Sequence, residues 1–460
     1  MNSIHVDNPN STDMNIKMLN LSKDNLNNFG SKFKNDIHST KNLRSTNHSA
    51  SRETKVFNNP PLGMQLQERI ARNFTQRFEQ QWGGKFILHG RTQKADAIRL
   101  DGNDYLNIVG HPEIVQAQIN ALRNNNQSVV QSGVFQLDQD PSRTLGIEIA
   151  NWIGKEDGVI CQSGFAANVG LLQSIADEKT PVYLDSLAHA SLREGAHTAR
   201  APAYLFRHND LTHLSRLIAQ HGPGIVVVDS VYSTTGAVCP LTEMVDIIEK
   251  NNCMILVDES HSLGTHGPNG AGLCAALGLS NRVHFITASL AKAFAGRAGF
   301  FSIPTAIRHY MLTTNNANIF SSCLLPHEIA GLAATLKVIQ HSENERILLR
   351  ENTRRIRASL SEMGYPIHHG SEQIIALEAG LESNVMILRD CLEERNVFGS
   401  IFCAPATSRN RAMVRLTLNS GLMPSDLECI ESVAEEIAPI VKPWNWPIAK
   451  RSHSAQRYNS

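Results

Sequence analysis

The chain has 460 residues, 42% of them hydrophobic and 19% charged, so it can bury a large core and is too long for one small module. Its 43 basic residues balance its 43 acidic residues, which argues against a global field that would attract nucleic acid or an anionic membrane. No stretch approaches the roughly 20 consecutive apolar residues that a membrane span needs. The eight cysteines include no Cys-x-x-Cys pair, which argues against a zinc ribbon or a disulfide framework and predicts reduced thiols in the cytoplasm.

The N-terminal segment 1–55 is rich in Asn, Ser and Lys and has only isolated apolar residues. It lacks the apolar region of a secretory signal and the acid-poor composition of a transit peptide, so we expect a disordered extension. The following segment, 56–105, contains apolar positions at helical spacing over 64–82 and predicts an amphipathic helix there. A strand and turn are expected within 98–109, and another helix over 111–125.

Short apolar runs alternate with helix-length segments from about residue 145 to 305. Each run is followed by polar or small residues, and the seven runs are GVICQS, PVYLDS, AYLFRH, GIVVVDS, MILVDES, VHFITAS and GFFSI. This alternation predicts an α/β fold whose large domain, 106–330, contains a mostly parallel seven-stranded sheet covered by helices on both faces. We expect functional side chains at the carboxyl ends of these strands.

The remainder of the chain predicts a smaller α+β domain over 331–445, followed by a tail, 446–460. Its expected elements are a long helix over 337–364 and strands within VMILRD (385–390) and MVRLTLN (413–419).

Two segments contain the residues with the clearest chemistry. In MILVDESHSLGTHG, a buried strand ends at Asp258 and is followed by His261; in VHFITASLAKAFAGRAG, another strand is followed by Ser289 and Lys292. The 34 residues between Asp258 and Lys292 suffice for one helix and one strand. Both side chains could therefore meet above neighbouring strand ends.

A lysine in a turn of Ala and Gly is poorly solvated, which lowers its pKa and makes the amine nucleophilic toward aldehydes. Pyridoxal phosphate (PLP) is the aldehyde cofactor that fits, and its ring nitrogen requires an acid partner. We predict that Lys292 binds the aldehyde, Asp258 faces the ring nitrogen and His261 donates to the phenolic oxygen. Alone, Lys292 could be a surface lysine and Asp258 a helix cap; their combination favours the cofactor site.

A phosphate site is expected where QSGFAANVGLLQSIA enters a helix through Ser163, Gly164 and Phe165. Backbone N–H groups and the dipole at a helix start attract anions. Ser289 offers a hydroxyl to the same phosphate. The alternative for this segment is an ordinary helix cap.

Three further residues are candidates for the site. His189 in LDSLAHASLREG could stack on a pyridine ring and handle a proton, or be a core histidine. Ser233 in SVYSTTGAVCPL could contact the ring oxygen, or be a turn residue. Arg415 lies mid-strand among apolar residues, where a substrate carboxylate or a buried Asp or Glu would offset the cost of burying its charge.

Taken together, these motifs resemble the α-oxoamine synthases, which are fold-type-I PLP enzymes. The resemblance covers about residues 60–440 and depends on the family order of NDYL (103–106), SGFAAN (163–168), D-x-x-x-HAS (185–191), FRHND (206–210), VDESHSLGTHGPNGAG (257–272) and the lysine turn. It implies a fold-type-I PLP transferase that condenses an acyl-CoA with an amino acid. It also implies a homodimer with shared active sites, in which Ser321 and Ser322 reach the phosphate of the neighbouring subunit's cofactor. Asn103 matches a family position near the substrate, and Arg415 the family's carboxylate-binding arginine.

Within the family, the chain is most similar to the synthases of α-aminoketone quorum-sensing autoinducers. This similarity depends on two segments. One is SLAKAFAGRAGF, which contains Arg297, and the other is VRLTLNSGL, which is not followed by His-Thr. It implies a decarboxylating condensation of a medium- or long-chain acyl-CoA with 2-aminobutyrate or S-adenosylmethionine. Two alternatives remain: an oxoamine synthase of primary metabolism, of the 8-amino-7-oxononanoate synthase or 2-amino-3-ketobutyrate ligase type, and a non-catalytic partner subunit. No metal site is predicted.

Overall fold

The computed structural model describes residues 60–88, 90–124 and 131–448, so the expected disorder of 1–55 and most of the tail 446–460 lie outside the described residues. The chain divides into two compact units, Met1–Lys85 and Phe86–Ser460. In the first unit, α2 (Met64–Asn73) continues as the π-helix η1 (Phe74–Gln81), which confirms the helix predicted there.

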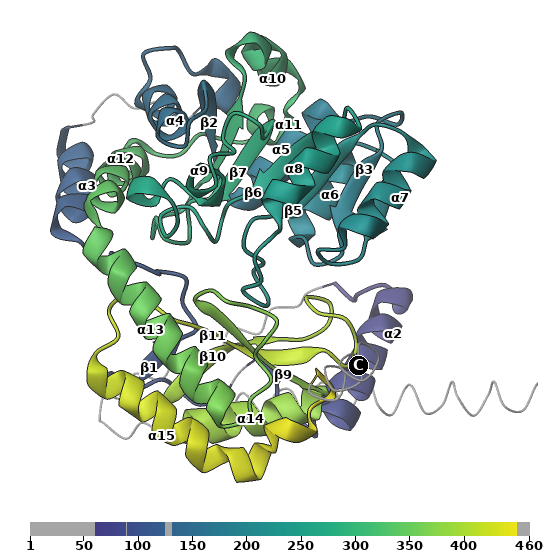
Figure 1. Ribbon diagram of the computed structural model, residues 1–460, viewed down its shortest axis with the longest axis vertical. Helices are drawn as coiled ribbons and strands as arrows, with labels where there is room; N and C mark the ends of the chain where they lie inside the picture. Colours follow the sequence, from purple (N-terminus) through teal and green to yellow (C-terminus); the bar gives the residue numbers. More distant parts are fainter. Residues whose placement is uncertain (1–59, 89, 125–130, 449–460) are drawn as a thin grey trace, which may run out of the picture. The chain divides into compact units, whose positions relative to one another are not determined.

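The second unit contains the predicted seven-stranded sheet, in the order β2-β8-β7-β6-β5-β3-β4 (Figure 1). All seven apolar runs are strands: β2 (Asp157–Cys161), β3 (Val182–Asp185), β4 (Ala203–Phe206), β5 (Ile225–Asp229), β6 (Met254–Asp258), β7 (Phe285–Ser289) and β8 (Gly299–Ile303). Only β8 runs antiparallel to its neighbours in this sheet. The prediction of a mostly parallel sheet is confirmed.

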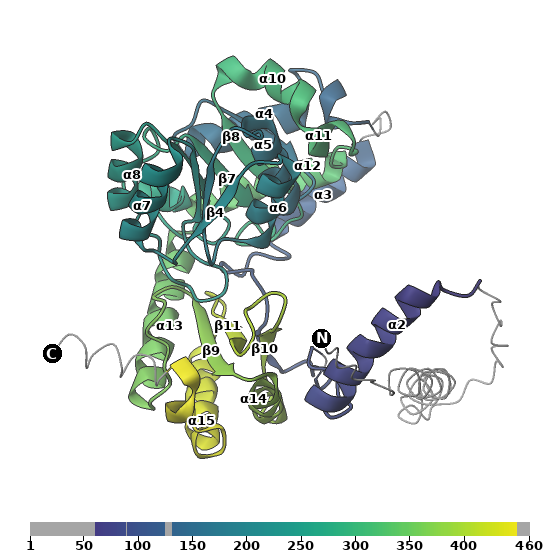
Figure 2. The same ribbon diagram turned by 90° about the vertical axis from the view of Figure 1, so that its right-hand side faces the viewer.

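Helices cover this sheet on both faces, which explains why its central strands are apolar throughout. The helices α5 (Gly164–Ile175) and α6 (Ala190–Thr198) pack together on one face, and α7 (Leu211–His221) and α8 (Leu241–Lys250) on the other (Figure 2). The remaining helices of this part are α3 (Pro112–Asn124), η2 (Gly133–Phe135), α4 (Pro141–Trp152), η3 (Pro268–Gly270), α9 (Leu273–Ala276), η4 (Thr305–Ile307), α10 (Arg308–Thr314) and α11 (Asn316–Ile319).

A second, four-stranded sheet forms the smaller α+β part of this unit, as predicted. Its order is β1 (Ile98–Leu100), β10 (Val397–Phe402), β11 (Ala412–Thr417) and β9 (Ile374–Gly380), with β1 parallel to β10 and the other pairs antiparallel. It packs against α14 (Glu382–Glu394), which in turn contacts α15 (Pro424–Val441), and η5 (Pro443–Asn445) follows α15. The strand β1 joins this sheet although it precedes the large sheet in sequence, so segments from before and after the large sheet form the second sheet together.

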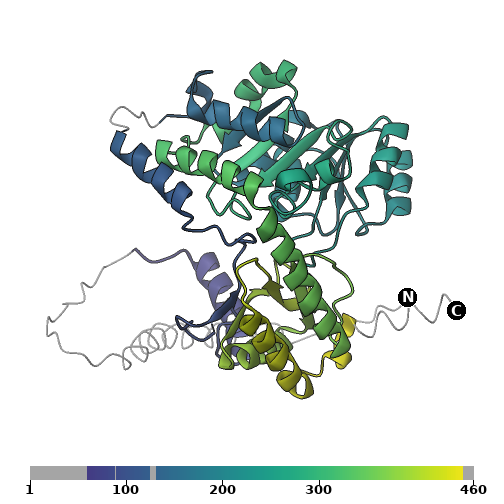
Figure 3. The ribbon, with the colours of Figure 1, turned by 60° about the vertical axis from the view of Figure 1, so that its left-hand side comes forward.

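Two expectations for this part were wrong. Residues 385–390 lie in α14 and not in a strand, because Val385, Leu388 and Leu392 recur at helical spacing and are buried on one face. The long helix expected over 337–364 is two helices, α12 (Pro326–His341) and α13 (Glu343–Glu362), and α12 packs beside α3 (Figure 3). The break is at Ser342, whose backbone leaves the helical region while its hydroxyl donates to the carbonyl of Val338 at 2.9 Å.

Candidate active site

Polar side chains gather at the carboxyl ends of the parallel strands, where open α/β sheets place their sites. Asp258 ends β6 and lies in register with Thr287 of the neighbouring β7, which ends at Ser289. The backbone N–H of Ser289 donates to Ser260 Oγ at 2.7 Å, which joins the two strand ends. The segments expected to carry the chemistry therefore meet.

Lys292 lies in the turn between β7 and β8, and its environment disfavours the ammonium form. The turn is closed by Leu290 N–H donating to Ala298 O at 2.9 Å and Ala295 N–H donating to Lys292 O at 2.8 Å. Burial lowers the pKa of the Lys292 amine, Arg415 lowers it further, and Asp258 opposes the shift. The amine is therefore more nucleophilic at neutral pH than a solvated lysine.

Asp258 is only 4% exposed and is surrounded by hydrogen-bond donors. Its Oδ2 accepts from Asn168 Nδ2 at 2.7 Å, and its Oδ1 accepts from the backbone N–H of Ser260 at 2.9 Å and from Ser260 Oγ at 2.5 Å. In the described part of the chain it forms no ion pair with Lys or Arg. The carboxylate is thus oriented while its charge remains available for a cationic ligand group.

His261 is fully enclosed behind the strand end and is held from two sides. Its Nδ1 lies 2.5 Å from Tyr105 Oη, and its carbonyl accepts from Gln373 Nε2 at 2.9 Å. Burial raises the pKa of the Tyr105 phenol, and burial with nearby Lys292 lowers the pKa of His261 well below its usual range. A protonated phenol donating to a neutral imidazole leaves the ring proton on Nε2. His261 can therefore donate from Nε2, and its contact with the phenolic oxygen of PLP stays a prediction.

His189 follows β3 and caps the start of α6. Its backbone N–H donates to Asp229 Oδ1 at 3.1 Å, and its Nδ1 lies 2.7 Å from Ser191 Oγ. The imidazole is exposed, and it is near enough to His261 to lower the pKa of that residue. It is therefore no core histidine, and its ring is available to a ligand at the strand ends.

The predicted phosphate site has the expected shape. Ser163 caps α5, with its Oγ accepting from Ala166 N–H at 3.1 Å, so the first N–H groups of the helix, those of Gly164 and Phe165, have no intrahelical acceptor. A Cβ added to Gly164 would lie 2.5 Å from Ser289 Cβ, so only glycine allows the helix start to approach this serine so closely. The backbone N–H groups at the start of α5 and the Ser289 side chain therefore lie next to each other.

Arg415 brings Ser233 and Asn103 together. Its Nη1 donates to Ser233 O at 2.9 Å, its Nη2 donates to Asn103 Oδ1 at 3.1 Å, and its guanidinium lies 4.7 Å from the centre of the Phe402 ring. Its Nε is buried without a partner, and no Asp or Glu among the described residues pairs with it. The alternative of a buried ion pair is therefore not what the structure shows; the unpaired donor suits a ligand carboxylate.

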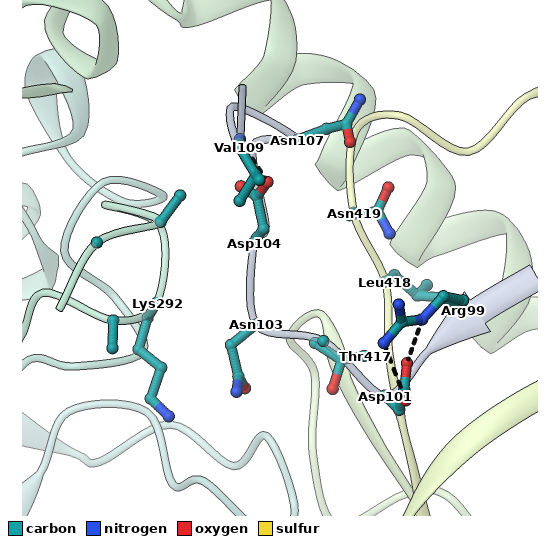
Figure 4. A pocket seen from close by; sticks show the side chains of 14 residues that line it. Arg99, Asp101, Asn103, Asp104, Asn107, Val109, Lys292, Thr417, Leu418 and Asn419 are labelled. Atoms are coloured by element: carbon teal, nitrogen blue, oxygen red, sulfur yellow. Dashed lines mark hydrogen bonds and ion pairs between the residues drawn. The ribbon is translucent and has the colours of Figure 1, made fainter. Parts of the chain in front are cut away.

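A cavity of about 480 Å³ opens beside Lys292. The lysine lies on one wall and the segment 101–109 on the facing wall, where Asn103 extends in the same direction as the lysine side chain (Figure 4). Residues 417–419, at the end of β11 and just after it, also line the cavity. The cavity gives a substrate access to the amine.

Ser321 and Ser322 follow α11 and lie near the phosphate corner of their own chain. The carbonyl of Ser322 accepts from Gln162 Nε2 at 2.7 Å, and Gln162 precedes Ser163. The neighbouring Phe320 is 82% exposed. Their contact with a neighbouring subunit's cofactor stays a prediction.

Comparisons with known proteins identify the family. Residues 95–430 match the aminotransferase class I and II family, which is most of the chain. The chain belongs to this family. It is 40% identical over 376 residues to the CAI-1 autoinducer synthase of Vibrio campbellii, covering 82% of this chain and 95% of that protein. An 8-amino-7-oxononanoate synthase of Symbiobacterium thermophilum is 30% identical, covering 74% of this chain and 87% of that protein.

Solved structures agree on the fold of the aminotransferase class I and II family. A serine palmitoyltransferase from S. paucimobilis has a TM-score of 0.72 at 22% identity, covering 75% of this chain and 88% of that chain. An 8-amino-7-oxononanoate synthase from Francisella tularensis has a TM-score of 0.67 at 20% identity, covering 75% of this chain and 99% of that chain. The fold is fold type I, and the relatives place the chain among the α-oxoamine synthases, which are PLP-dependent acyltransferases.

The residues at the strand ends fit PLP. The desolvated lysine suits the aldehyde of PLP, and the oriented carboxylate without a cation suits its ring nitrogen. The helix start with free N–H groups suits the phosphate, and the buried guanidinium with an unpaired Nε suits the substrate carboxylate. Among the residues that the structure describes, no cluster of His, Cys, Asp and Glu could hold a metal ion. No helix in the described part is long and apolar enough to cross a membrane.

Four residues around the site escaped the sequence prediction: Tyr105, Asn168, Ser191 and Ser260. All four are buried and lie inside the motifs quoted above. Their only sequence signal is that they are polar residues within otherwise apolar or small-residue motifs.

Replacing Lys292 tests the central assignment. Lys292→Ala should abolish the near-visible absorbance of lysine-bound PLP and lower turnover at least about a hundredfold, because it removes both the bound amine and the base. The exposed Lys250, changed to alanine, is the matched control. The measurements are an absorption spectrum and the turnover of the purified variant. A Lys292→Ala variant that keeps both its colour and its turnover contradicts the assignment.

Glu259 gives the fold a pH dependence next to the site. It is fully buried, its Oε1 accepts from Cys274 N–H at 2.7 Å, and burial raises its pKa from 4.5 to about 7. The folded protein keeps this proton up to pH about 7 whereas the unfolded chain releases it near 4.5, so stability falls as the pH rises between these values.

The contribution of Glu259 to this loss is on the order of 3 kcal/mol. The melting temperature should therefore fall less between pH 5 and pH 8 in Glu259→Gln than in the unchanged protein. Glu243→Gln, at an exposed position on α8, is the control and should behave as the unchanged protein does. Equal falls in all three proteins would show that Glu259 does not titrate in this range.

Proposed function

We propose that the chain condenses a medium- or long-chain acyl-CoA with S-adenosylmethionine or 2-aminobutyrate, with loss of carbon dioxide, to give an α-aminoketone precursor of a quorum-sensing autoinducer. The observation that carries this proposal is the 40% identity to a CAI-1 autoinducer synthase over 95% of that protein's length. The relatives from primary metabolism are more distant, at 26–30% identity, so they support the chemistry rather than their own substrates.

In the proposed reaction a bond forms between the donor's α-carbon and the acyl carbon, the thioester C–S bond breaks to release CoA, and the donor's carboxylate leaves as carbon dioxide. PLP, when bound, supplies an electron sink for the carbanion at the α-carbon. The chain's own residues must therefore bind the carboxylate, remove the α-proton and keep the ring nitrogen protonated.

Each of these tasks has a residue suited to it. The unpaired Nε of Arg415 offers a donor to the substrate carboxylate at a buried position. The desolvated amine of Lys292 is a base for the α-proton. With PLP bound, the carboxylate of Asp258 would hold the proton of the ring nitrogen, and Nε2 of His261 would donate to the ring oxygen. His189 would contact the ring. Because Lys292 is present, a non-catalytic partner subunit is disfavoured.

The cavity has room for S-adenosylmethionine as well as for 2-aminobutyrate. Its volume of about 480 Å³ exceeds what a small amino acid needs, and Asn103, Asn107 and Asn419 make its lining polar. The Asp104 carboxylate in the same wall accepts from the backbone N–H groups of Ile108 and Val109, and burial raises its pKa. It is the carboxylate that we propose for the sulfonium cation.

Product analysis tests the substrates. Purified protein with decanoyl-CoA and, separately, S-adenosylmethionine, 2-aminobutyrate, glycine or serine should give an α-aminoketone by mass spectrometry, with S-adenosylmethionine turned over fastest. Asp104→Asn should lower kcat/KM for S-adenosylmethionine about tenfold and leave that for 2-aminobutyrate unchanged, because only the former is cationic. Preferred use of glycine or serine would instead support a synthase of primary metabolism.

We further propose that the enzyme is a homodimer with shared active sites. Phe320 is 82% exposed, Phe135 67% and Phe165 51%, an unusual exposure for three aromatic side chains. They belong to connected segments, because Ser132 Oγ donates to Ile319 O at 2.5 Å and Gln162 donates to Ser322. A second copy of the chain would bury this aromatic patch beside Ser163.

Complementation tests the shared site. Lys292→Ala and the double variant Ser321→Ala/Ser322→Ala should each be impaired alone, whereas mixed dimers contain one site with an intact Lys292 from one subunit and intact serines from the other. Mixing under conditions that allow subunit exchange should therefore restore turnover well above the sum of the two variants. A monomer in analytical ultracentrifugation, or no gain on mixing, contradicts the proposal.

A further inference from the structure

A continuous series of side-chain hydrogen bonds joins His189 to Asp258 beneath the site. Ser191 Oγ lies 2.7 Å from His189 Nδ1 and 2.8 Å from Asn168 Nδ2. The same nitrogen of Asn168 lies 2.7 Å from Asp258 Oδ2. Asn168 is 2% exposed and Ser191 is fully buried, so bulk water does not compete for these bonds.

The directions of these bonds follow from which atoms can donate. A carboxylate oxygen only accepts, so Asn168 must turn its NH₂ group toward Asp258; the opposite amide orientation would face two oxygens against each other. The second hydrogen of the same NH₂ group then points at Ser191 Oγ. Asn168 Oδ1 is buried without a partner, which shows that the two donated bonds alone determine how this side chain is placed.

The direction continues to the imidazole. Because Ser191 Oγ accepts from Asn168, its own hydrogen is free for His189 Nδ1. The backbone N–H of Ser191 points to the same ring nitrogen at 3.3 Å. With two donors on it, Nδ1 is an acceptor, and the proton of a neutral ring lies on Nε2.

We propose that Asn168 and Ser191 are positioning residues, which set the Nε2–H tautomer of His189 and the orientation of the Asp258 carboxylate through one amide group. The inference rests on the proposed function only in requiring that PLP binds between these two residues. It implies that His189 can donate a hydrogen bond from Nε2 to a substrate oxygen. Nε2 cannot accept a proton until it has released the proton that it already carries.

The test uses the holoenzyme without substrate. The variants are Ser191→Ala, which removes the hydroxyl, Ser191→Thr, which keeps it, and Asn168→Asp, which keeps the shape but turns an acceptor toward Asp258. Ser174→Ala is the matched control, because Ser174 is a buried serine of α5 whose hydroxyl donates only to Gly170 O at 2.8 Å. PLP affinity is measured by equilibrium titration, and ring orientation by circular dichroism in the cofactor's absorption band.

Asn168→Asp should weaken PLP binding about tenfold or more, since a donor to a charged group is lost. Ser191→Ala should keep the affinity within about twofold, yet change the dichroism band, and Ser191→Thr should restore it. In the Ser191→Ala background, Asn168→Asp should still lower the affinity, because Asn168 contacts Asp258 directly and not through Ser191.

A dichroism band in Ser191→Ala that equals that of Ser174→Ala overturns the inference, as does an Asn168→Asp variant with unchanged PLP affinity. If Asn168→Asp fails to fold, the two Ser191 variants still test the inference. The dichroism band should change in Ser191→Ala and return in Ser191→Thr. Normal PLP binding with silent variants refutes the positioning roles alone, whereas an unchanged protein that binds no PLP refutes the proposed function as well.

Discussion

The site depends on one buried anion that has no cation of its own. Removing a carboxylate from water is costly unless donors or a counter-charge replace the lost hydration. At Asp258 the chain supplies three hydrogen-bond donors and no ion pair among the described residues, so the side chain is fixed while its charge remains uncompensated. A protonated ring nitrogen completes such a site, and the strand end of β6 becomes useful only when that ligand is present.

The basic groups around this anion lower one another's pKa values. Arg415 and burial together lower the pKa of Lys292, and burial with Lys292 and Arg415 lowers that of His261. Each group is thereby kept closer to its neutral form than it would be alone, which suits an amine that must attack and an imidazole that must donate from one nitrogen.

The sequence predicted the framework well and its supporting contacts poorly. Apolar runs ending in polar residues were sufficient for all seven strands and for placing Asp258 at the end of β6, because a buried strand and its end have a local signature. Residues 385–390 were mistaken for a strand because a short apolar run fits either element, and the helical spacing becomes visible only when Leu392 is read together with Val385 and Leu388. Asn168 and Ser191 could not be assigned, since 23 residues separate them and their meeting depends on how α5 packs on α6.

Chemistry and substrate choice are carried by different parts of the chain. The groups suited to the cofactor lie on the ends of β6 and β7 and the start of α5, which are rigid elements of the large sheet. The wall that would face an amino donor is the irregular segment 101–109, together with the end of β11 from the second sheet. A loop can change its side chains without disturbing a parallel sheet, so donors can diverge while the reaction is kept.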